Sequence, residues 1–402
     1  MHAIADTEKL VSDGIITGEQ AAIVEARARE TMVYLAINSL LCFGIIAATA
    51  GLIFWLKNAM AVAICGALAL AVGLFILARG RELFHMFGNA SALIGAGMLI
   101  GGASLELLDK YEGIAGWALI AAGLVITGIA AWVLQQGNIK ARFVSGSILL
   151  MGGAMHLGGV AFLLEQNSIS GMPISLFYLY ATFAVAGAGW ITNVRFVTAL
   201  AIIPFAQALD TGTFYFHAAY AFYSPESTLS ILQMSLLIGL CIWAGGRLEE
   251  RTTRHLRILT IMAFIVANLC ALVGSLWGDF VGETTWGPGY SRYGSGVETW
   301  QEWRALRDAF RETAFYISEE IYAILWALIL VAMAAWAAFG NRRGLFNTTL
   351  TFIGIHAYTQ MFESFGDEPL AYVIGGLAAI PLAWGMLQLN HWLVTRADQS
   401  QP

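Results

Sequence analysis

The chain has 402 residues, of which 58% are hydrophobic and 12% are charged, and its formal net charge is −6. Soluble domains average roughly 45 to 50% apolar residues, so this composition excludes a water-soluble protein and indicates a membrane protein. The sequence contains no phosphate loop, zinc-protease motif, nucleophile elbow or basic patch with interleaved aromatic residues. It therefore predicts no catalytic residue and no nucleic-acid partner, and the four cysteines have no spacing that suits zinc.

Residues 1–31 are acidic and polar and precede the first apolar segment. Residues 8–13 predict a short helix that ends at Gly14, and Thr17 with Gln20 forms a capping box that opens a second helix. We expect a small cytoplasmic helical hairpin, because no signal peptide is present. Its few apolar residues cannot form a core alone, so we expect it to dock on the membrane domain, on a second copy or on a protein partner.

Residues 10–21, Leu-Val-Ser-Asp-Gly-Ile-Ile-Thr-Gly-Glu-Gln-Ala, are followed by a segment that ends Gly-Leu-Ile-Phe-Trp at residue 55. This pattern resembles the start of a bacterial family of polytopic membrane proteins described only as a domain of unknown function. The resemblance covers about 60 residues and implies a multi-pass inner-membrane protein. It brings no activity, substrate or functional residue, and a similar pattern occurs in oligomerisation hairpins of unrelated proteins.

Twelve apolar segments follow, each about 20 residues long, which is what a helix needs to cross a hydrocarbon core of about 30 Å. In lipid only a helix or a closed barrel satisfies its own backbone polar groups, so we predict an all-α polytopic transmembrane bundle of about 12 spans. The predicted spans are residues 32–56, 59–78, 89–108, 114–134, 143–165, 173–191, 196–218, 228–246, 257–278, 318–340, 345–365 and 370–394.

Basic residues alternate between the two sides of these spans. With the N-terminus inside, 15 of the 21 Lys and Arg residues lie on the inner side, and four of the other six lie in one long outer loop, residues 279–317. The positive-inside rule then predicts that both termini, including the tail 395–402, lie on the cytoplasmic side of a bacterial inner membrane. The membrane domain comprises spans 1–9 (32–278) and spans 10–12 (318–394). Acids are biased oppositely, with 10 inside and 17 outside.

Polar residues in the seventh predicted span share one helical face. Gln207, Asp210 and His217 are spaced for a helix, and Pro204 precedes them by one turn. Proline removes a backbone hydrogen bond, so we expect a bend that frees a carbonyl group. Ionisable groups at such positions cost about 2.5 to 3.5 kcal/mol each to insert, so they are expected to face the bundle interior or water.

The eleventh predicted span carries a second polar face, which includes His356 and Glu363, and His156 of the fifth span is expected at the same depth as His356. Three hypotheses stay open. The polar groups could be contacts between helices. They could form a cation or proton pathway, with Asp210 and Glu363 exchanging charge and the histidines relaying protons. A haem between His156 and His356 is the least supported, because two histidines alone do not define a haem site.

Several acids lie toward the outer ends of the predicted spans, namely Glu106, Glu165, Asp210 and Glu363. If those ends converge, the acids would form an outer mouth that raises the local cation concentration. The alternative is that acids accumulate wherever basic residues are excluded.

The outer loop 279–317 has two parts. A glycine- and aromatic-rich segment around Trp286 predicts turns, and from Val297 onward Trp300, Trp303 and Phe310 form an apolar stripe. This stripe predicts an amphipathic helix at the outer membrane interface. An alternative is a lid whose aromatic residues Trp286, Trp300 and Trp303 bind a sugar, a lipid or a peptide.

These observations favour a secondary transporter or channel-like protein for a proton, a cation or a small solute. A non-transporting scaffold or complex subunit is the first alternative. A membrane enzyme that acts on lipid-linked substrates is the second.

Overall fold

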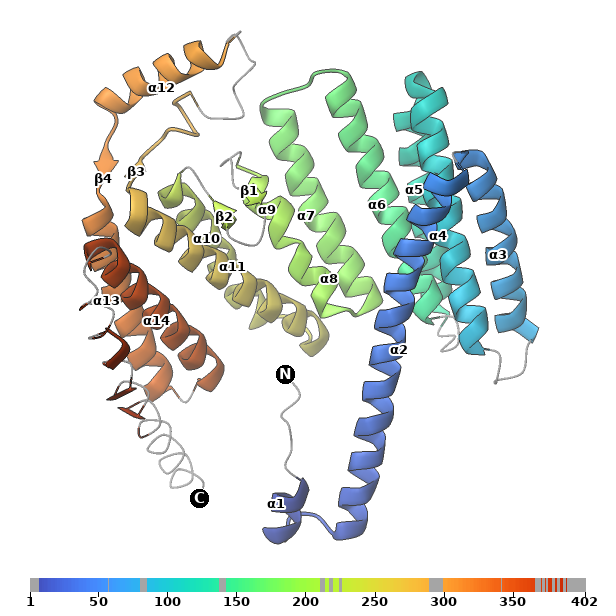
Figure 1. The fold of residues 1–402 in the computed structure, drawn as a ribbon, viewed down its shortest axis with the longest axis horizontal. Coiled ribbons are helices and arrows are strands. Elements are labelled where there is room, and N and C mark those ends of the chain that lie inside the picture. The colour runs from blue at the N-terminus through green and yellow to red at the C-terminus, as the bar shows by residue number, and fades with distance from the viewer. Residues whose placement is uncertain are drawn as a thin grey trace. The chain divides into compact units, whose positions relative to one another are not determined.

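The computed structural model describes residues 7–56, 58–79, 85–136, 142–209, 214–216, 220–223, 226–288, 299–340, 342–365 and isolated positions from 370 to 388. Helices account for most of these residues (Figure 1). The chain divides into two compact units, residues 1–166 and 167–402, and each is described by itself.

The first unit begins with the predicted hairpin. Helix α1 (Thr7–Ser12) ends before Gly14, which has a φ of +70°. The capping box is confirmed, because the Thr17 amide donates to Gln20 Oε1 at 2.9 Å and the Gln20 amide donates to Thr17 Oγ1 at 3.2 Å. Helix α2 (Gly18–Leu56) then continues for 39 residues, so the second hairpin helix and the first predicted span form one uninterrupted helix.

Two helical hairpins follow in the first unit: α3 (Ala59–Arg79) with α4 (His85–Lys110), and α5 (Glu112–Gln135) with α6 (Arg142–Gln166). Helix α3 packs along α4, and α5 packs along α6. Helix α4 also contacts α5 and α6, and it thereby joins the two hairpins.

Glycines allow close approach within both hairpins. A Cβ atom on Gly123 would lie 2.5 Å from the His156 amide nitrogen, and one on Gly159 would lie 2.8 Å from the Ile120 amide nitrogen. The helix backbones therefore pack directly against each other, as small residues permit in membranes. Each of the four helices has two such glycines seven residues apart: Gly66, Gly73, Gly95, Gly102, Gly116, Gly123, Gly152 and Gly159. The two hairpins thus repeat one packing pattern.

The second unit contains helices separated by two small antiparallel strand pairs. Its elements are α7 (Met172–Thr192), α8 (Arg195–Leu200), α9 (Ile202–Gln207), β1 (Phe214–Phe216), β2 (Tyr220–Tyr223), α10 (Ser227–Gly245), α11 (Glu250–Trp277), β3 (Asp279–Phe280), α12 (Trp300–Thr313), β4 (Tyr316–Ile317), α13 (Glu319–Phe339) and α14 (Arg343–Phe365). Strand β1 pairs with β2, and β3 pairs with β4. A core among α9, α10 and α11 comprises Ile202, Ala206, Met234, Ala263, Val266 and Cys270.

The prediction of one continuous seventh span, residues 196–218, is wrong. Helix α8 ends at Leu200, α9 ends at Gln207, and residues 214–216 form strand β1. Pro204 has no amide hydrogen to donate to the Leu200 carbonyl, which accounts for the interruption between α8 and α9. Strand β1 therefore interrupts the single helix predicted for this segment, and Asp210 and His217 lie outside the described residues.

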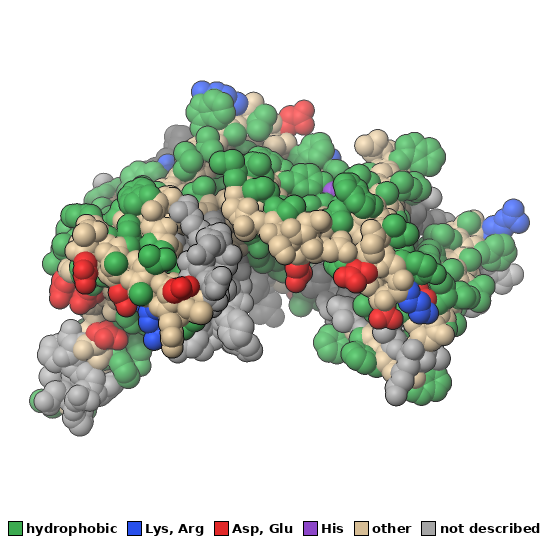
Figure 2. All heavy atoms as spheres, turned by 90° about the horizontal axis from the view of Figure 1, so that it is seen from above, with side chains coloured by type: hydrophobic (Ala, Val, Ile, Leu, Met, Phe, Trp, Pro, Cys, Tyr) green, Lys and Arg blue, Asp and Glu red, His purple; other side chains and the backbone are tan. Residues whose placement is uncertain are grey.

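Among the described residues, eight helices are long and apolar enough to cross a membrane, namely α3, α4, α5, α6, α7, α10, α11 and α13. They match the predicted spans 2–6 and 8–10 to within a few residues at most ends. Hydrophobic side chains cover much of the face drawn in Figure 2, and large ones such as Trp117 (67% exposed) and Leu328 (61% exposed) lie on the surface of these helices. Apolar surfaces of this kind are what lipid contact requires.

The predicted amphipathic helix in the outer loop is confirmed as α12. Its first turn is capped by Thr299, whose hydroxyl oxygen accepts a hydrogen bond from the Glu302 amide at 3.2 Å. Trp303 is buried at 3% exposure, and Phe310 is partly buried on the same face, seven residues later. This spacing of two turns fits a helix that packs one apolar side.

Candidate functional site

Two of the predicted pathway residues lie in the first unit, and both have partners there. Glu106 is buried at the end of α4 and accepts a hydrogen bond from Lys110 Nζ at 2.7 Å, one turn along the same helix. His156 is buried on α6, and its Nδ1 lies 3.1 Å from the Ile120 carbonyl oxygen of α5. His156 thus links the two helices where Gly123 brings their backbones together.

The other predicted pathway residues belong to the second unit. Gln207 is the last residue of α9, and Asp210 and His217 lie outside the described residues. The ring of His356 of α14 contacts the ring of Trp326 edge to face, with 4.7 Å between the ring centroids. Glu363 is exposed near the end of α14. The two histidines of the haem hypothesis therefore belong to different units. Among the described residues no group of three His, Cys, Asp or Glu side chains could hold a metal ion.

His255 is a buried histidine near the start of α11, and the sequence analysis did not single it out. His255 Nδ1 is 2.6 Å from Thr198 Oγ1 of α8, and His255 Nε2 is 3.3 Å from Asn193 Oδ1. Such a hydroxyl–imidazole–amide chain has the connectivity of a nucleophilic site. Thr198 and His255 are only 2% and 3% exposed, so no substrate reaches the hydroxyl group. These hydrogen bonds instead hold the turn between α7 and α8 against α11.

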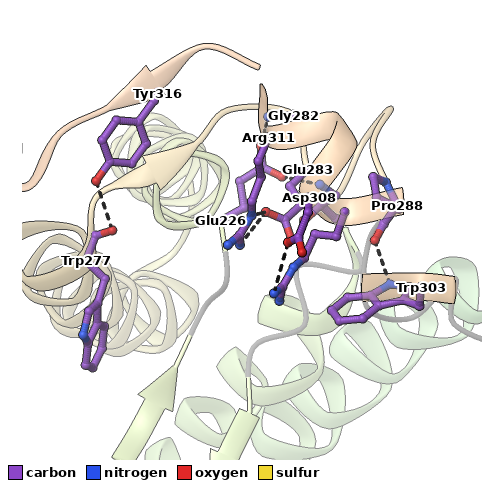
Figure 3. A network of polar contacts seen from close by, with 11 residues as sticks. Glu226, Trp277, Gly282, Glu283, Pro288, Trp303, Asp308, Arg311 and Tyr316 are labelled. Atoms are coloured by element: carbon purple, nitrogen blue, oxygen red, sulfur yellow. Dashed lines mark hydrogen bonds and ion pairs between the residues drawn. The ribbon is translucent and has the colours of Figure 1, made fainter. Parts of the chain in front are cut away.

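The densest polar network in the described part of the second unit lies where α10 begins and α11 ends. Glu226 directly precedes α10, and its two carboxylate oxygens accept hydrogen bonds from the amides of Gly282 and Thr284, each at 2.7 Å (Figure 3). In the opposite direction along the chain, Asp279 of β3 accepts a hydrogen bond on its Oδ2 from the Thr228 amide of α10, at 2.8 Å. The start of α10 and the segment after α11 thus hold each other through two buried carboxylates.

Asp279 has further partners. Its Oδ2 also accepts from the Thr228 hydroxyl group and from the Tyr322 hydroxyl group of α13, the latter at 3.2 Å. Thr228 Oγ1 lies 2.5 Å from the Tyr322 oxygen. The triangle of Asp279, Thr228 and Tyr322 therefore joins α10, β3 and α13.

The same network anchors α12. Arg311 donates to Glu283 Oε2 from both Nε (2.9 Å) and Nη2 (2.8 Å), and the Trp303 indole donates to the Pro288 carbonyl oxygen at 2.9 Å (Figure 3). Glu283 and Trp303 are only 5% and 3% exposed. Of the three tryptophans predicted to bind a ligand, Trp303 is thus an internal anchor, whereas Trp286 and Trp300 are exposed.

Three polar atoms near this network are buried without a hydrogen-bond partner among the described residues: Asp279 Oδ1, Ser227 Oγ and Gln233 Oε1. Ser227, Ser230 and Gln233 are all buried and occur every third residue of α10, and we call them the α10 polar stripe. Gln233 Nε2 donates to the Phe205 carbonyl oxygen at 2.5 Å, inside the interrupted α8–α9 segment. A partly satisfied polar line therefore leads from Asp279 along α10 to that interruption.

The electrostatics of this network favour the neutral form of one acid. Burial raises the pKa of Asp279 above its ordinary value of 3.8, and the nearby charge of Glu226 acts in the same direction. The hydrogen bonds from Thr228 and Tyr322 oppose this increase in the pKa only in part. Close by, the hydrogen bond to Glu319 raises the pKa of Tyr316 to about 12. Asp279 is thus the acid whose protonation the surroundings promote.

Sequence reasoning missed Glu226, Asp279 and Glu283 as site residues. All three fall just outside the predicted spans, where acids usually face water, and nothing local to them indicates burial. The spacing of Ser227, Ser230 and Gln233 at the start of the eighth predicted span was the available signal, because it places three polar groups along one side of a helix.

The fold and this network define a helical protein whose described helices fit a membrane and which buries carboxylates at one end of an α10–α11–α13 group. Comparisons with protein-family models, with curated proteins and with solved structures found no match. The resemblance of the first 60 or so residues to an uncharacterised bacterial family therefore stays a prediction.

Proposed function

We propose that the chain is a multi-pass protein of a bacterial inner membrane, with about twelve spans and both termini in the cytoplasm, that conducts or transports protons or a small cation. The alternation of basic residues supports the orientation. The eight apolar helices support the membrane location. Asp279, rather than Asp210 or Glu363, is the acid that we assign to the outer end of the pathway.

The observation that carries this proposal is the buried Asp279 Oδ1, which has no partner among the described residues. A buried acceptor without a partner costs about 1 to 3 kcal/mol, and a cation or a water molecule would remove that cost, whereas a proton would remove the buried charge. Ser227 Oγ and Gln233 Oε1 present the same deficit further along α10. Gln233 lies inside the eighth predicted span, and polar side chains inside membrane spans usually mark an ion or proton path.

The interrupted α8–α9 segment supports the inner continuation of the path. Transporters place ion sites at broken helices, where backbone carbonyl groups become available as ligands. Here Gln233 reaches the Phe205 carbonyl group of α9, so the α10 polar stripe ends at such a break.

The test is proton and monovalent-cation flux into liposomes that contain the purified chain. We expect flux in the native protein, a decrease of at least about tenfold in Asp279→Asn, and native flux in Glu312→Gln, which removes an exposed carboxylate of α12. Size-exclusion profiles of the three proteins report folding. Absence of flux in the native chain, or native flux in a folded Asp279→Asn variant, would overturn the proposal.

A scaffold or complex subunit is the second candidate, and one observation favours it. Both carboxylate oxygens of Glu226 hold the segment before α12, and Glu283 Oε2 holds α12 through Arg311, as a rigid platform for a partner requires. Pull-down of a stoichiometric partner that is lost when residues 1–30 are deleted, together with absent flux, would establish this function instead.

A further inference from the structure

An apolar groove lies in the first unit, whereas the Asp279 network belongs to the second. Its volume is about 400 Å³, and it is lined by α3, α5 and α6 through residues that include Leu74, Leu77, Ile129, Val133, Val144 and Ser145. Sites for small ligands commonly have volumes of about 300 to 1,000 Å³. The groove is therefore large enough for part of a lipid-sized molecule.

The groove is a consequence of how the two hairpins pack. Glycines draw α3 onto α4 and α5 onto α6, but the hairpins join each other chiefly through α4. Helix α3 therefore diverges from α5 and α6, and a gap remains between them. Ala130 and Val144 are buried at 4% and 2% exposure, whereas Leu74 and Ile129 are about half exposed, so the gap has a closed floor and an open side.

Basic residues stand at one end of the groove. Arg79, the last residue of α3, follows the lining residue Ala78, and Arg142, the first residue of α6, precedes the lining residue Ser145 by one turn. Both arginines are exposed, and neither has an ion-pair partner among the described residues. An apolar channel with a cationic end matches an anionic amphiphile.

We propose that this groove binds one anionic phospholipid, with an acyl chain between α3 and α5–α6 and the phosphate against Arg79 and Arg142. Basic pockets between transmembrane helices recognise anionic lipid headgroups, and arginine presents several donors to a phosphate group. The lipid fills the space between α3 and the α5–α6 hairpin, and its single negative charge offsets part of the positive charge of Arg79 and Arg142. This inference does not depend on the proposed transport function.

The test is native mass spectrometry of the full-length chain with phosphatidylglycerol and phosphatidylcholine that carry identical acyl chains. We expect phosphatidylglycerol to bind at least about fivefold more tightly, since each basic residue near an anionic lipid contributes about 1 kcal/mol. Arg79→Gln with Arg142→Gln should abolish that preference. Ala78→Phe, which fills the groove from its open side, should weaken the binding of both lipids.

The matched control is Arg254→Gln with Arg257→Gln, which removes the same charge from exposed arginines of α11. It should keep the native preference. Equal binding of both lipids, a preference that survives in the Arg79/Arg142 variant, or one that the control loses equally would overturn the proposal. Binding of glycerol 3-phosphate as tight as that of the lipid would also overturn it, because the acyl chain would then contribute nothing.

Discussion

The α5–α6 and α10–α11 hairpins are both antiparallel helix pairs of membrane-spanning length, but different contacts hold them together. In α5–α6, Gly116, Gly123, Gly152 and Gly159 bring the backbones into direct contact. In α10–α11 the described glycines do not face the partner helix so closely, and Gly274 instead faces Tyr322 of α13. That pair is closed by carboxylates where α10 begins and α11 ends, and by buried polar side chains along α10.

The difference separates packing from chemistry. A glycine contact needs no water and no proton, so it is stable in lipid and offers nothing to an ion. A buried carboxylate binds protons and cations, so the contacts in a helix pair joined by carboxylates can change when a proton or a cation binds. This contrast is why we place function in the second unit, and three variants test it.

The largest effect is expected in the glycine-packed pair. Gly123→Leu would push a side chain into the backbone of His156, and overpacking of this kind destabilises by about 3 kcal/mol. Gly128→Leu on the same helix is the control, because no atom lies within 4 Å of its added Cβ. Thermal unfolding in detergent measures both. Equal stability of the two variants would mean that close backbone contact does not hold this pair.

An intermediate effect is expected in the carboxylate-joined pair. Glu226→Gln replaces one charged acceptor with an amide group, so one of its two backbone amide donors loses its partner. Hydrogen bonds to charged groups contribute about 1.5 to 3 kcal/mol, so we expect a loss of about 2 kcal/mol in the free energy of unfolding. Glu312→Gln, an exposed acid of α12, should change little. A Glu226→Gln protein as stable as that control would refute the structural role of this carboxylate.

The smallest effect is a pH dependence confined to the second unit. Because burial raises the pKa of Asp279 above 3.8, the folded protein binds that proton more tightly than the unfolded chain does. Stability from this group is therefore complete below about pH 3.8 and is lost as the pH rises through the folded-state pKa. Unfolding midpoints from pH 4 to 8 should fall in the native chain relative to Asp279→Asn. Parallel curves would contradict a raised pKa.

Much of the fold could be predicted because it depends on local sequence. Apolar segment length predicts α3 to α7 and α10, α11 and α13, and side-chain chemistry at Thr17 and Gln20 predicts the start of α2. The seventh span failed because hydropathy counts the residues around Pro204 as apolar whether or not they form one helix. The helical periodicity assigned to Gln207, Asp210 and His217 required a helix that continues to residue 218, but the observed helix α9 ends at Gln207.

For the candidate site, the sequence indicated the kind of residue, acids near the ends of predicted spans, but not which acids are buried. From these acids it selected Glu106, Asp210 and Glu363. In the structure Glu106 is paired with Lys110 and Glu363 is exposed. The buried acids Glu226 and Asp279 are 53 residues apart in the chain, and their burial follows from the turn that folds the segment after α11 back onto α10.

The sequence by itself determined the positions of most helices and that several of them are apolar enough to cross a membrane, because these properties follow from composition and from contacts a few residues apart. Tertiary structure decided which polar groups are buried together, which glycines meet a backbone and where the hairpins diverge. Those properties depend on residues distant in the chain, and no local pattern encodes whether Asp279 meets water or the amide of Thr228.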